Sequence, residues 1–289
     1  KVQISLRSEK SMLECIKRQN FGGIVLRISV KNGESWTRTD ALWMALSIDR
    51  QLRTQKDHPV ILSFAGGGGK TSYIRRLAWE GRERGLKVLV MTTTHMAEPE
   101  HFAVFNRDLE MVRSMLEKES IAVAGCPVKD GKIAFWGEDF YKQAAALADI
   151  VLIEADGSKR LPVKVPGENE PVIPEDSSAI ICIYGLGAVG KQADSCCFRL
   201  NQSEALLKLK DEEKNGHWIM TEEKMAYLMR KGYLKPLRKV FSDSTVIMAL
   251  NQADTKEAEE QGKYILKSAG EEQGILTGKL YEESSFDLF

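Results

Sequence analysis

The stretch LSFAGGGGKTS, residues 62–72, decides the fold, because it joins an apolar run to four glycines, a lysine and a threonine. The run PVILSFA, residues 59–65, is typical of a buried strand. Residues 71–84 carry apolar side chains at helical spacing and predict an amphipathic helix. The sequence therefore predicts a strand, a glycine loop and a helix in immediate succession.

The glycine loop, residues 66–69, is suited to holding a phosphate. Glycine has no Cβ, so a glycine turn at a helix N-terminus can surround an oxyanion with backbone N–H groups. A following lysine can reach the terminal phosphates, and a following hydroxyl can complete the shell of a bound Mg²⁺. The full pattern GxxxxGK[ST] has glycine where this chain has Phe64, so a flexible strand-to-helix connection is the alternative interpretation. The predicted phosphate-binding residues are Gly66, Gly67, Gly68, Gly69, Lys70, Thr71 and Ser72.

Two carboxylates, Glu154 and Asp156, end the apolar run IVLIEAD at residues 150–156. Ligands of open parallel sheets lie at the carboxyl ends of the strands, and a nucleotide-bound Mg²⁺ needs a carboxylate there. We predict that Asp156 binds the metal together with Thr71, and that Lys70, Glu154 and Asp156 are catalytic. One carboxylate would hold the metal while the other orients the attacking water. Solvated acids at a strand end are the alternative.

The sequence LNQAD, residues 250–254, is similar to the base-recognition sequence NKxD of GTPases. Asn251 and Asp254 match it, whereas Gln252 replaces the lysine. The pattern predicts that Asn251 and Asp254 face the base, and it favours guanine over adenine. Chance matches to so short a pattern are common.

A second glycine motif, GLGAVG at residues 185–190, matches the dinucleotide pattern GxGxxG. That pattern needs a helix that opens at the glycines, and the following KQADSCCFRL shows no helical periodicity. We therefore expect a bent loop that borders the active cleft.

Two further segments carry polar side chains. Thr92, Thr93, Thr94 and His95 end the run VMTTTH, where they could contact a phosphate, or serve only as strand formers and a buried histidine. The proline loop, residues 157–177, contains four of the eight prolines and reads as an extended loop over the sheet. Its cations could bind an anionic second substrate or close on the γ-phosphate, with a solvated basic loop as the equal alternative; they are Lys159, Arg160 and Lys164.

The chain beyond residue 58 alternates apolar runs with helical segments, which indicates an α/β fold: a doubly wound, mostly parallel sheet of P-loop NTPase type. We expect an NTPase-like domain at residues 58–289 with a charged helical insertion at about 191–240. Residues 1–57 are expected to form an N-terminal extension, with a hairpin turning at Asn32-Gly33 and a helix around 39–53.

Composition excludes several classes of protein. Lysine plus arginine equals aspartate plus glutamate at 41 each, so bulk charge argues against a nucleic-acid partner. No apolar stretch approaches the roughly 18 residues of a membrane span, and the first residues lack a signal core. The five irregularly spaced cysteines favour reduced thiols in a cytoplasmic protein over disulfides or zinc, and adjacent Cys196 and Cys197 are a weak indication of a soft-metal site.

Taken in order, SFAGGGGKTS, MTTTHM, VLIEADGSKRLPVKVPGENEPVIP and LNQAD resemble the YqeC family of accessory proteins for selenium-dependent molybdenum hydroxylases. The resemblance covers residues 36–270, and the proline loop is its most specific part. Two family histidines are absent: the Glu-His-Glu-Pro sequence reads ENEP at residues 168–171, and a His-Arg pair reads Phe198-Arg199. Arg199 stays available as a charge stabiliser.

The resemblance implies a P-loop NTPase that helps to mature a molybdenum hydroxylase or its cofactor, with that enzyme or cofactor as a partner. With the motifs it predicts binding and hydrolysis of GTP or ATP with Mg²⁺ as cofactor, GTP being favoured. The alternatives are a small-molecule kinase or ligase, a non-catalytic binder of a phosphate-bearing molybdenum cofactor and, last, a dinucleotide-dependent dehydrogenase. A homodimer is one option for its assembly.

Overall fold

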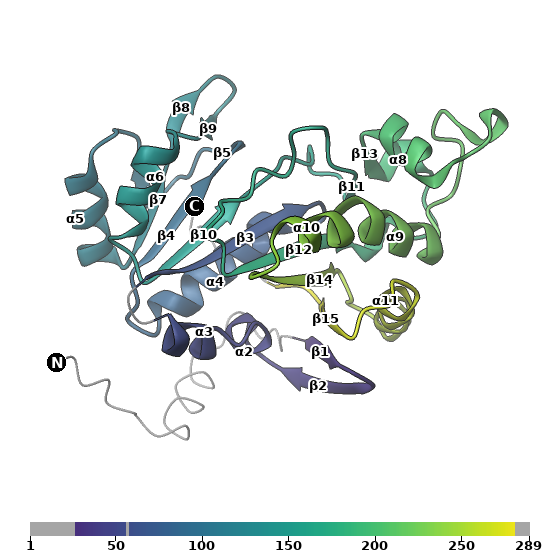
Figure 1. Ribbon diagram of the computed structural model, residues 1–289, viewed down its shortest axis with the longest axis horizontal. Helices are drawn as coiled ribbons and strands as arrows, with labels where there is room; N and C mark the ends of the chain where they lie inside the picture. The colour runs from purple at the N-terminus through teal and green to yellow at the C-terminus, as the bar shows by residue number, and fades with distance from the viewer. Residues whose placement is uncertain (1–26, 56–57, 281–289) are drawn as a thin grey trace.

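The computed structural model describes residues 27–55 and 58–280, and its centre is a ten-stranded sheet (Figure 1). Every neighbouring pair from β15 to β6 is parallel, whereas β1 at the other edge pairs antiparallel with both β15 and β2. In order across the sheet the strands are β2 (Ser35–Thr39), β1 (Ile28–Asn32), β15 (Gln273–Thr277), β14 (Thr245–Asn251), β12 (Ala179–Gly185), β3 (Val60–Gly66), β10 (Ile150–Glu154), β4 (Val88–Thr92), β7 (Ile121–Ala124) and β6 (Ala103–Val104).

The predicted α/β class is confirmed. Every residue of β3, β4, β7, β10 and β12 is buried, as expected for apolar parallel strands that are covered on both faces. β3 is central, and it continues through the glycine loop into a helix. The helices are α2 (Leu42–Ala45), α3 (Ile48–Thr54), α4 (Lys70–Arg82), α5 (Leu109–Glu119), α6 (Glu138–Ala145), α7 (Ala193–Cys196), α8 (Leu200–Leu207), α9 (Glu222–Met229), α10 (Lys235–Val240) and α11 (Lys256–Ser268).

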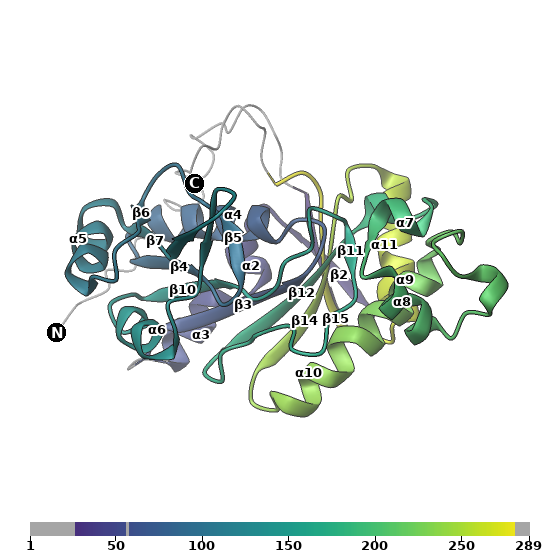
Figure 2. The ribbon, with the colours of Figure 1, turned by 90° about the horizontal axis from the view of Figure 1, so that it is seen from above.

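Helices cover both faces of the sheet and build three apolar clusters. One cluster joins Leu62 and Phe64 of β3 to α2, α3 and α4. The opposite face gives Ile61 to a cluster with α5 and α6, and Ala65 to a cluster with α9, α10 and α11. Figure 2 shows α5 and α6 at one end of the sheet and α7 to α11 at the other, so the centre of the sheet lies between two groups of helices.

The predicted N-terminal hairpin is present, and β1 pairs with β15, so it extends the main sheet. Residues 1–26 and 56–57 of the predicted extension, including Cys15, lie outside the described residues. The single helix predicted around 39–53 is wrong, because Ser47 adopts a left-handed conformation (φ 51°) and divides it into α2 and α3. The short helix α2 is held against α4 by buried Glu80, which accepts the Leu42 N–H at 3.2 Å and the Trp43 N–H at 2.7 Å.

Residues 191–240 are largely helical, as predicted for the insertion. Between α9 and α10 the chain widens into a π-helical turn, Arg230–Leu234. Strand β11 (Val163–Lys164), within the proline loop, pairs with β13 (Cys197–Phe198) and ties that loop to the helical group. A small antiparallel sheet of β5 (His95–Ala97), β9 (Lys132–Ala134) and β8 (Cys126–Val128) projects beyond β4 in Figure 1.

Candidate functional site

The glycine loop turns sharply between β3 and α4, and its backbone requires glycine. Gly66, Gly68 and Gly69 have φ values of 98°, 72° and 133°, which side-chain-bearing residues rarely adopt. Gly67 has an ordinary φ, but a Cβ there would lie 2.6 Å from the Leu161 carbonyl oxygen. All four glycines are therefore needed for this close packing.

The N–H groups of the loop fall into two sets. The first three donate to the protein: Gly66 to the Asp156 carboxylate at 3.0 and 3.1 Å, Gly67 to the Ile183 carbonyl at 2.8 Å, and Gly68 to the Leu161 carbonyl at 3.2 Å. The next four have no acceptor among the described residues, and they stand at the N-terminus of the 13-residue helix α4. Four such N–H groups at the positive end of a helix dipole form a site for an oxyanion. They belong to Gly69, Lys70, Thr71 and Ser72.

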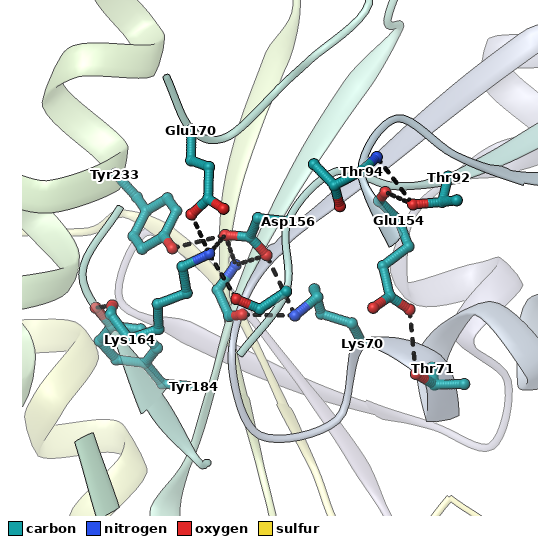
Figure 3. A network of polar contacts seen from close by, with 12 residues as sticks. Lys70, Thr71, Thr92, Thr94, Glu154, Asp156, Lys164, Glu170, Tyr184 and Tyr233 are labelled. Atoms are coloured by element: carbon teal, nitrogen blue, oxygen red, sulfur yellow. Dashed lines mark hydrogen bonds and ion pairs between the residues drawn. The ribbon is translucent and has the colours of Figure 1, made fainter. Parts of the chain in front are cut away.

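Asp156 is the centre of a buried polar network beneath the loop (Figure 3). Besides the Gly66 N–H, its carboxylate accepts the Tyr233 hydroxyl at 2.8 Å and forms ion pairs of 3.2 Å with Lys70 and with Lys164. Its side chain is fully buried. Because both of its oxygens are engaged by protein donors, Asp156 is placed to fix the loop and its lysine.

Lys70 lies at the first position of α4 with its side chain almost completely buried. The ammonium donates to the Gly66 carbonyl at 2.6 Å and pairs with Asp156. Its charge is therefore held directly under the glycine loop, within the network that shapes it.

Glu154 engages a different partner. Its carboxylate accepts the Thr71 hydroxyl at 3.1 Å, and Figure 3 shows it reaching toward α4 while Asp156 reaches toward Lys164 and Tyr233. Burial raises the pKa of Glu154 above its ordinary value, against the opposing effects of Lys70 and the Thr71 hydrogen bond. A carboxylate and a hydroxyl side by side at a strand end are oxygen ligands of the type that Mg²⁺ takes.

Thr94 and Thr92 lie beside Glu154 in Figure 3. The Thr92 hydroxyl donates to the Glu154 carbonyl at 2.9 Å and accepts the Thr94 N–H at 3.1 Å. The buried Thr94 hydroxyl has no hydrogen-bond partner within the described part of the chain. His95, by contrast, is exposed on β5, so the alternative of a buried histidine is wrong.

Asn251 joins the end of β14 to the glycine loop. Its amide donates to the Gly68 carbonyl at 2.9 Å and accepts the Thr277 hydroxyl at 2.9 Å. Asp254 lies at the following turn, where it accepts the Lys279 N–H at 2.6 Å. Asn251 thus contacts the glycine loop, whereas Asp254 lies beside the residues that follow β15.

The GLGAVG segment is a bent loop, as predicted, with a 3₁₀ turn at Leu186–Ala188 in place of the helix that a dinucleotide site needs. The Gly185 N–H donates to the Pro162 carbonyl at 2.9 Å, and the Gly187 N–H donates to the Gln252 side chain at 3.1 Å. It therefore borders the glycine loop and the LNQAD turn.

The proline loop crosses the site, as predicted, but Lys164 is not solvated. It is fully buried, donates to the Gly157 carbonyl at 2.7 Å, and pairs with Glu170 and Asp156. Lys159 and Arg160 are exposed. Glu170 also pairs with Arg199 at 2.9 Å, so the cations of this loop have different surroundings.

The cysteines and carboxylates do not form a metal centre: in residues 27–55 and 58–280 no group of three or more Cys, His, Asp or Glu side chains could hold a metal. Cys196 and Cys197 are buried, and burial raises the pKa of their thiols to about 11 and about 12. Of the helices described, none offers the length of apolar sequence that a membrane span requires.

Sequence reasoning missed several residues of the site, because they come from distant parts of the chain. Tyr233 is 77 residues from Asp156, and Thr277 connects Asn251 to the Tyr73 hydroxyl at 2.8 Å. Tyr184 donates to the Lys164 carbonyl. No local pattern marks these residues; an aromatic in the helical insertion was the only available signal for Tyr233.

Comparison with known proteins gives a family match over residues 62–201, to the model of the YqeC protein family. A curated relative, "Uncharacterized protein YqeC" of Escherichia coli (strain K12), is 37% identical over 161 residues. The alignment covers 52% of this chain and 60% of that protein, less than two thirds of its length. The chain is therefore similar to the YqeC family over residues 62–201, a shorter stretch than the 36–270 over which the resemblance was expected.

Two solved structures share low sequence identity with the chain. The hydrogenase maturation factor HypB from Archaeoglobus fulgidus is 14% identical, with a TM-score of 0.30, covering 77% of this chain and 83% of that one. The signal recognition particle receptor FtsY from Elizabethkingia anophelis is 13% identical, with a TM-score of 0.32, covering 83% of this chain and 65% of that one.

Proposed function

We propose that this chain, similar to the YqeC family over residues 62–201, binds a nucleoside triphosphate with Mg²⁺ and hydrolyses it. The observation that carries the proposal is the row of four N–H groups at the start of α4 that have no acceptor among the described residues, directly after the glycine loop and beside Lys70. A phosphate placed there meets the helix dipole, the N–H groups and an ammonium together. Phosphoryl transfer depends mainly on such positioning and charge neutralisation.

Thr71 and Glu154 are the residues that fit a magnesium ion best, since both present oxygen and already lie 3.1 Å apart. When bound, the metal would neutralise charge on the phosphates. Asp156, predicted as a metal ligand, has its oxygens occupied by Gly66, Tyr233 and two lysines. We therefore assign Asp156 to positioning Lys70 and the loop. The unpartnered Thr94 hydroxyl is available to a water or a phosphate oxygen.

The base would lie against the LNQAD turn, with Asn251 fixing the glycine loop and Asp254 accepting hydrogen bonds from the ring. A carboxylate that accepts hydrogen bonds from the base favours guanine, because guanine presents N–H donors at its edge. In keeping with the family resemblance, we propose that hydrolysis serves the maturation of a molybdenum hydroxylase or its cofactor.

Phosphate release from GTP and ATP, measured with and without Mg²⁺ in the parent and in Thr71→Ala, tests this proposal. The expected result is Mg²⁺-dependent turnover, preferring GTP, that Thr71→Ala reduces at least tenfold. Ser178→Ala removes a hydroxyl of similar size away from the loop, where it bonds Gln55 at 2.8 Å, and serves as the control. Turnover that is equal in all three proteins, or absent from the parent, would contradict hydrolysis at this site.

A further inference from the structure

A second concentration of positive charge surrounds the ring of Phe198, where β13 meets β11. The Lys159 ammonium lies 5.2 Å from the ring centroid, the Arg199 guanidinium carbon 5.4 Å and the Lys164 ammonium 5.8 Å. Cations this close to an aromatic ring are attracted by its negative face. The ring thus gathers three cations from two distant segments of the chain.

The carboxylates of the cluster do not balance this charge. Lys164 forms ion pairs with Asp156 and Glu170, and Glu170 also forms an ion pair with Arg199. Asp156 is shared in turn with Lys70. Lys159 has no carboxylate partner within the described residues and is exposed. Three cations therefore share two carboxylates, and Lys159 adds a fourth positive charge on the outer side of the cluster.

The Arg199 side chain also has a buried N–H donor without an acceptor in the described part of the chain. Its Nη2 pairs with Glu170, but its buried Nε–H has no hydrogen-bond partner. Leaving such a donor unpaired is unfavourable, so an acceptor is expected. The guanidinium is fixed by close packing on Gly167, where a Cβ would clash with it. A fixed, partly unsatisfied guanidinium and an exposed ammonium around the same aromatic ring are suited to a planar or tetrahedral oxyanion.

This cluster lies next to the proposed nucleotide site. Lys159 is two residues from Leu161, at most about 7 Å of extended chain, and the Leu161 carbonyl accepts the Gly68 N–H at 3.2 Å. Consecutive ion pairs run from Lys70 through Asp156, Lys164 and Glu170 to Arg199. The two cationic regions are therefore parts of one network.

We propose that Lys159 and Arg199 bind the phosphate or carboxylate group of a second small molecule, beside the glycine loop. Its role as second substrate rests on the proposed nucleotide site, whereas binding of the anion itself does not. Lys164 is a positioning residue, since it is buried and holds Glu170 and the loop backbone.

Calorimetric titration of the full chain with inorganic phosphate, and separately with succinate, tests the site without nucleotide or Mg²⁺. The variants are Lys159→Gln, which alters an exposed side chain and leaves folding intact, and Arg199→Gln. The control is the double variant Lys129→Gln, Lys132→Gln, which removes two exposed charges from the β8–β9 hairpin. Thermal melting verifies that each protein is folded.

We expect Lys159→Gln and Arg199→Gln each to weaken binding of the preferred anion about tenfold, which corresponds to a loss of about 1.4 kcal/mol of binding free energy. The control should keep that binding event. A stronger response to phosphate or to succinate identifies the anion class. Equal binding by the parent, Lys159→Gln and Arg199→Gln would overturn the proposal. If the parent binds no triphosphate but keeps the Lys159-dependent event, the anion site stands and the proposed function fails.

Discussion

The Asp156 carboxylate lies 3.2 Å from the Lys70 ammonium, in a place where the side chains are 0% and 4% exposed. A buried ion pair of this kind is stable only because further donors satisfy the carboxylate, here the Gly66 N–H, the Tyr233 hydroxyl and Lys164. The lysine that would meet a phosphate is thus fixed by the same acid that shapes the loop.

Replacing Asp156 by asparagine should strongly destabilise the protein. The change removes the carboxylate that forms ion pairs with both Lys70 and Lys164, and leaves the two buried ammonium groups on either side of a neutral amide. Removing one partner of a buried pair costs about 3–5 kcal/mol, which urea unfolding measures. Asp211→Asn is the matched control, because its pair with Lys214 at 2.6 Å lies on the surface, where ion pairs contribute little. Equal stability of Asp156→Asn and the parent would refute the network.

Glu154 should make stability fall as pH rises above the ordinary carboxyl range. Burial raises its pKa in the folded protein, so between the unfolded and folded pKa values the folded state binds more protons than the unfolded state. Raising the pH through that window therefore lowers the free energy of unfolding. Glu154→Gln removes the titrating carboxyl group. It should therefore make the free energy of unfolding less dependent on pH and should stabilise the protein at neutral pH. Urea unfolding from pH 4 to 8 measures the effect, and an unchanged slope in the variant would contradict it.

The effect of Mg²⁺ on triphosphate binding should depend on the ionisation of Glu154. A protonated Glu154 cannot bind Mg²⁺, so the gain in triphosphate affinity from Mg²⁺ should shrink as pH falls below the raised pKa of Glu154. In Glu154→Gln that gain should be small at every pH. Titrations of the parent and the variant across pH, with and without Mg²⁺, measure it; a gain that persists in the variant would assign the metal to other ligands.

Two glycine substitutions should have opposite outcomes. Gly68 has φ 72° and an added Cβ would clash with the Gly185 backbone, so Gly68→Ala should distort the loop and weaken triphosphate binding at least tenfold. Gly187 has an ordinary φ, and its Cβ would meet only the flexible Gln252 side chain at 2.8 Å. Gly187→Ala should therefore bind within about twofold of the parent. The reverse ranking would favour GLGAVG as the ligand loop.

The buried thiols should be slow to react. Thiolates are the reactive form, and the raised pKa values of about 11 for Cys196 and about 12 for Cys197 leave little thiolate at pH 8. Labelling the folded protein with iodoacetamide and mapping it by mass spectrometry should modify partly exposed Cys126 before Cys196 and Cys197. Labelling of Cys196 or Cys197 as fast as Cys126 would instead indicate an accessible, activated thiol.

Sequence patterns predicted the parts of the fold that depend on neighbouring residues. The apolar run of β3, the four glycines and the helical spacing of α4 are local signals, and the structure has this order. The GLGAVG segment was interpreted correctly because a dinucleotide motif needs a helix beside it, and KQADSCCFRL shows no helical pattern.

The parts that sequence could not give depend on tertiary contacts. Lys164 looks like any solvated lysine of a proline loop, but the fold buries it between Asp156 and Glu170. Ser47 breaks the helix predicted around 39–53, since Glu80 of α4 holds the start of α2 separately. β15 was missed because the five residues QGILT become a strand only through pairing with β14 and β1.

Calorimetric titration of the purified chain with GTP, ATP, CTP and NADP, each with and without Mg²⁺, tests the central claim most directly. The account predicts Mg²⁺-dependent binding of a triphosphate, with GTP preferred, that Lys70→Ala weakens at least tenfold at a temperature where thermal melting shows the variant folded. Absence of triphosphate binding, binding of NADP alone, or equal binding by folded Lys70→Ala would contradict it.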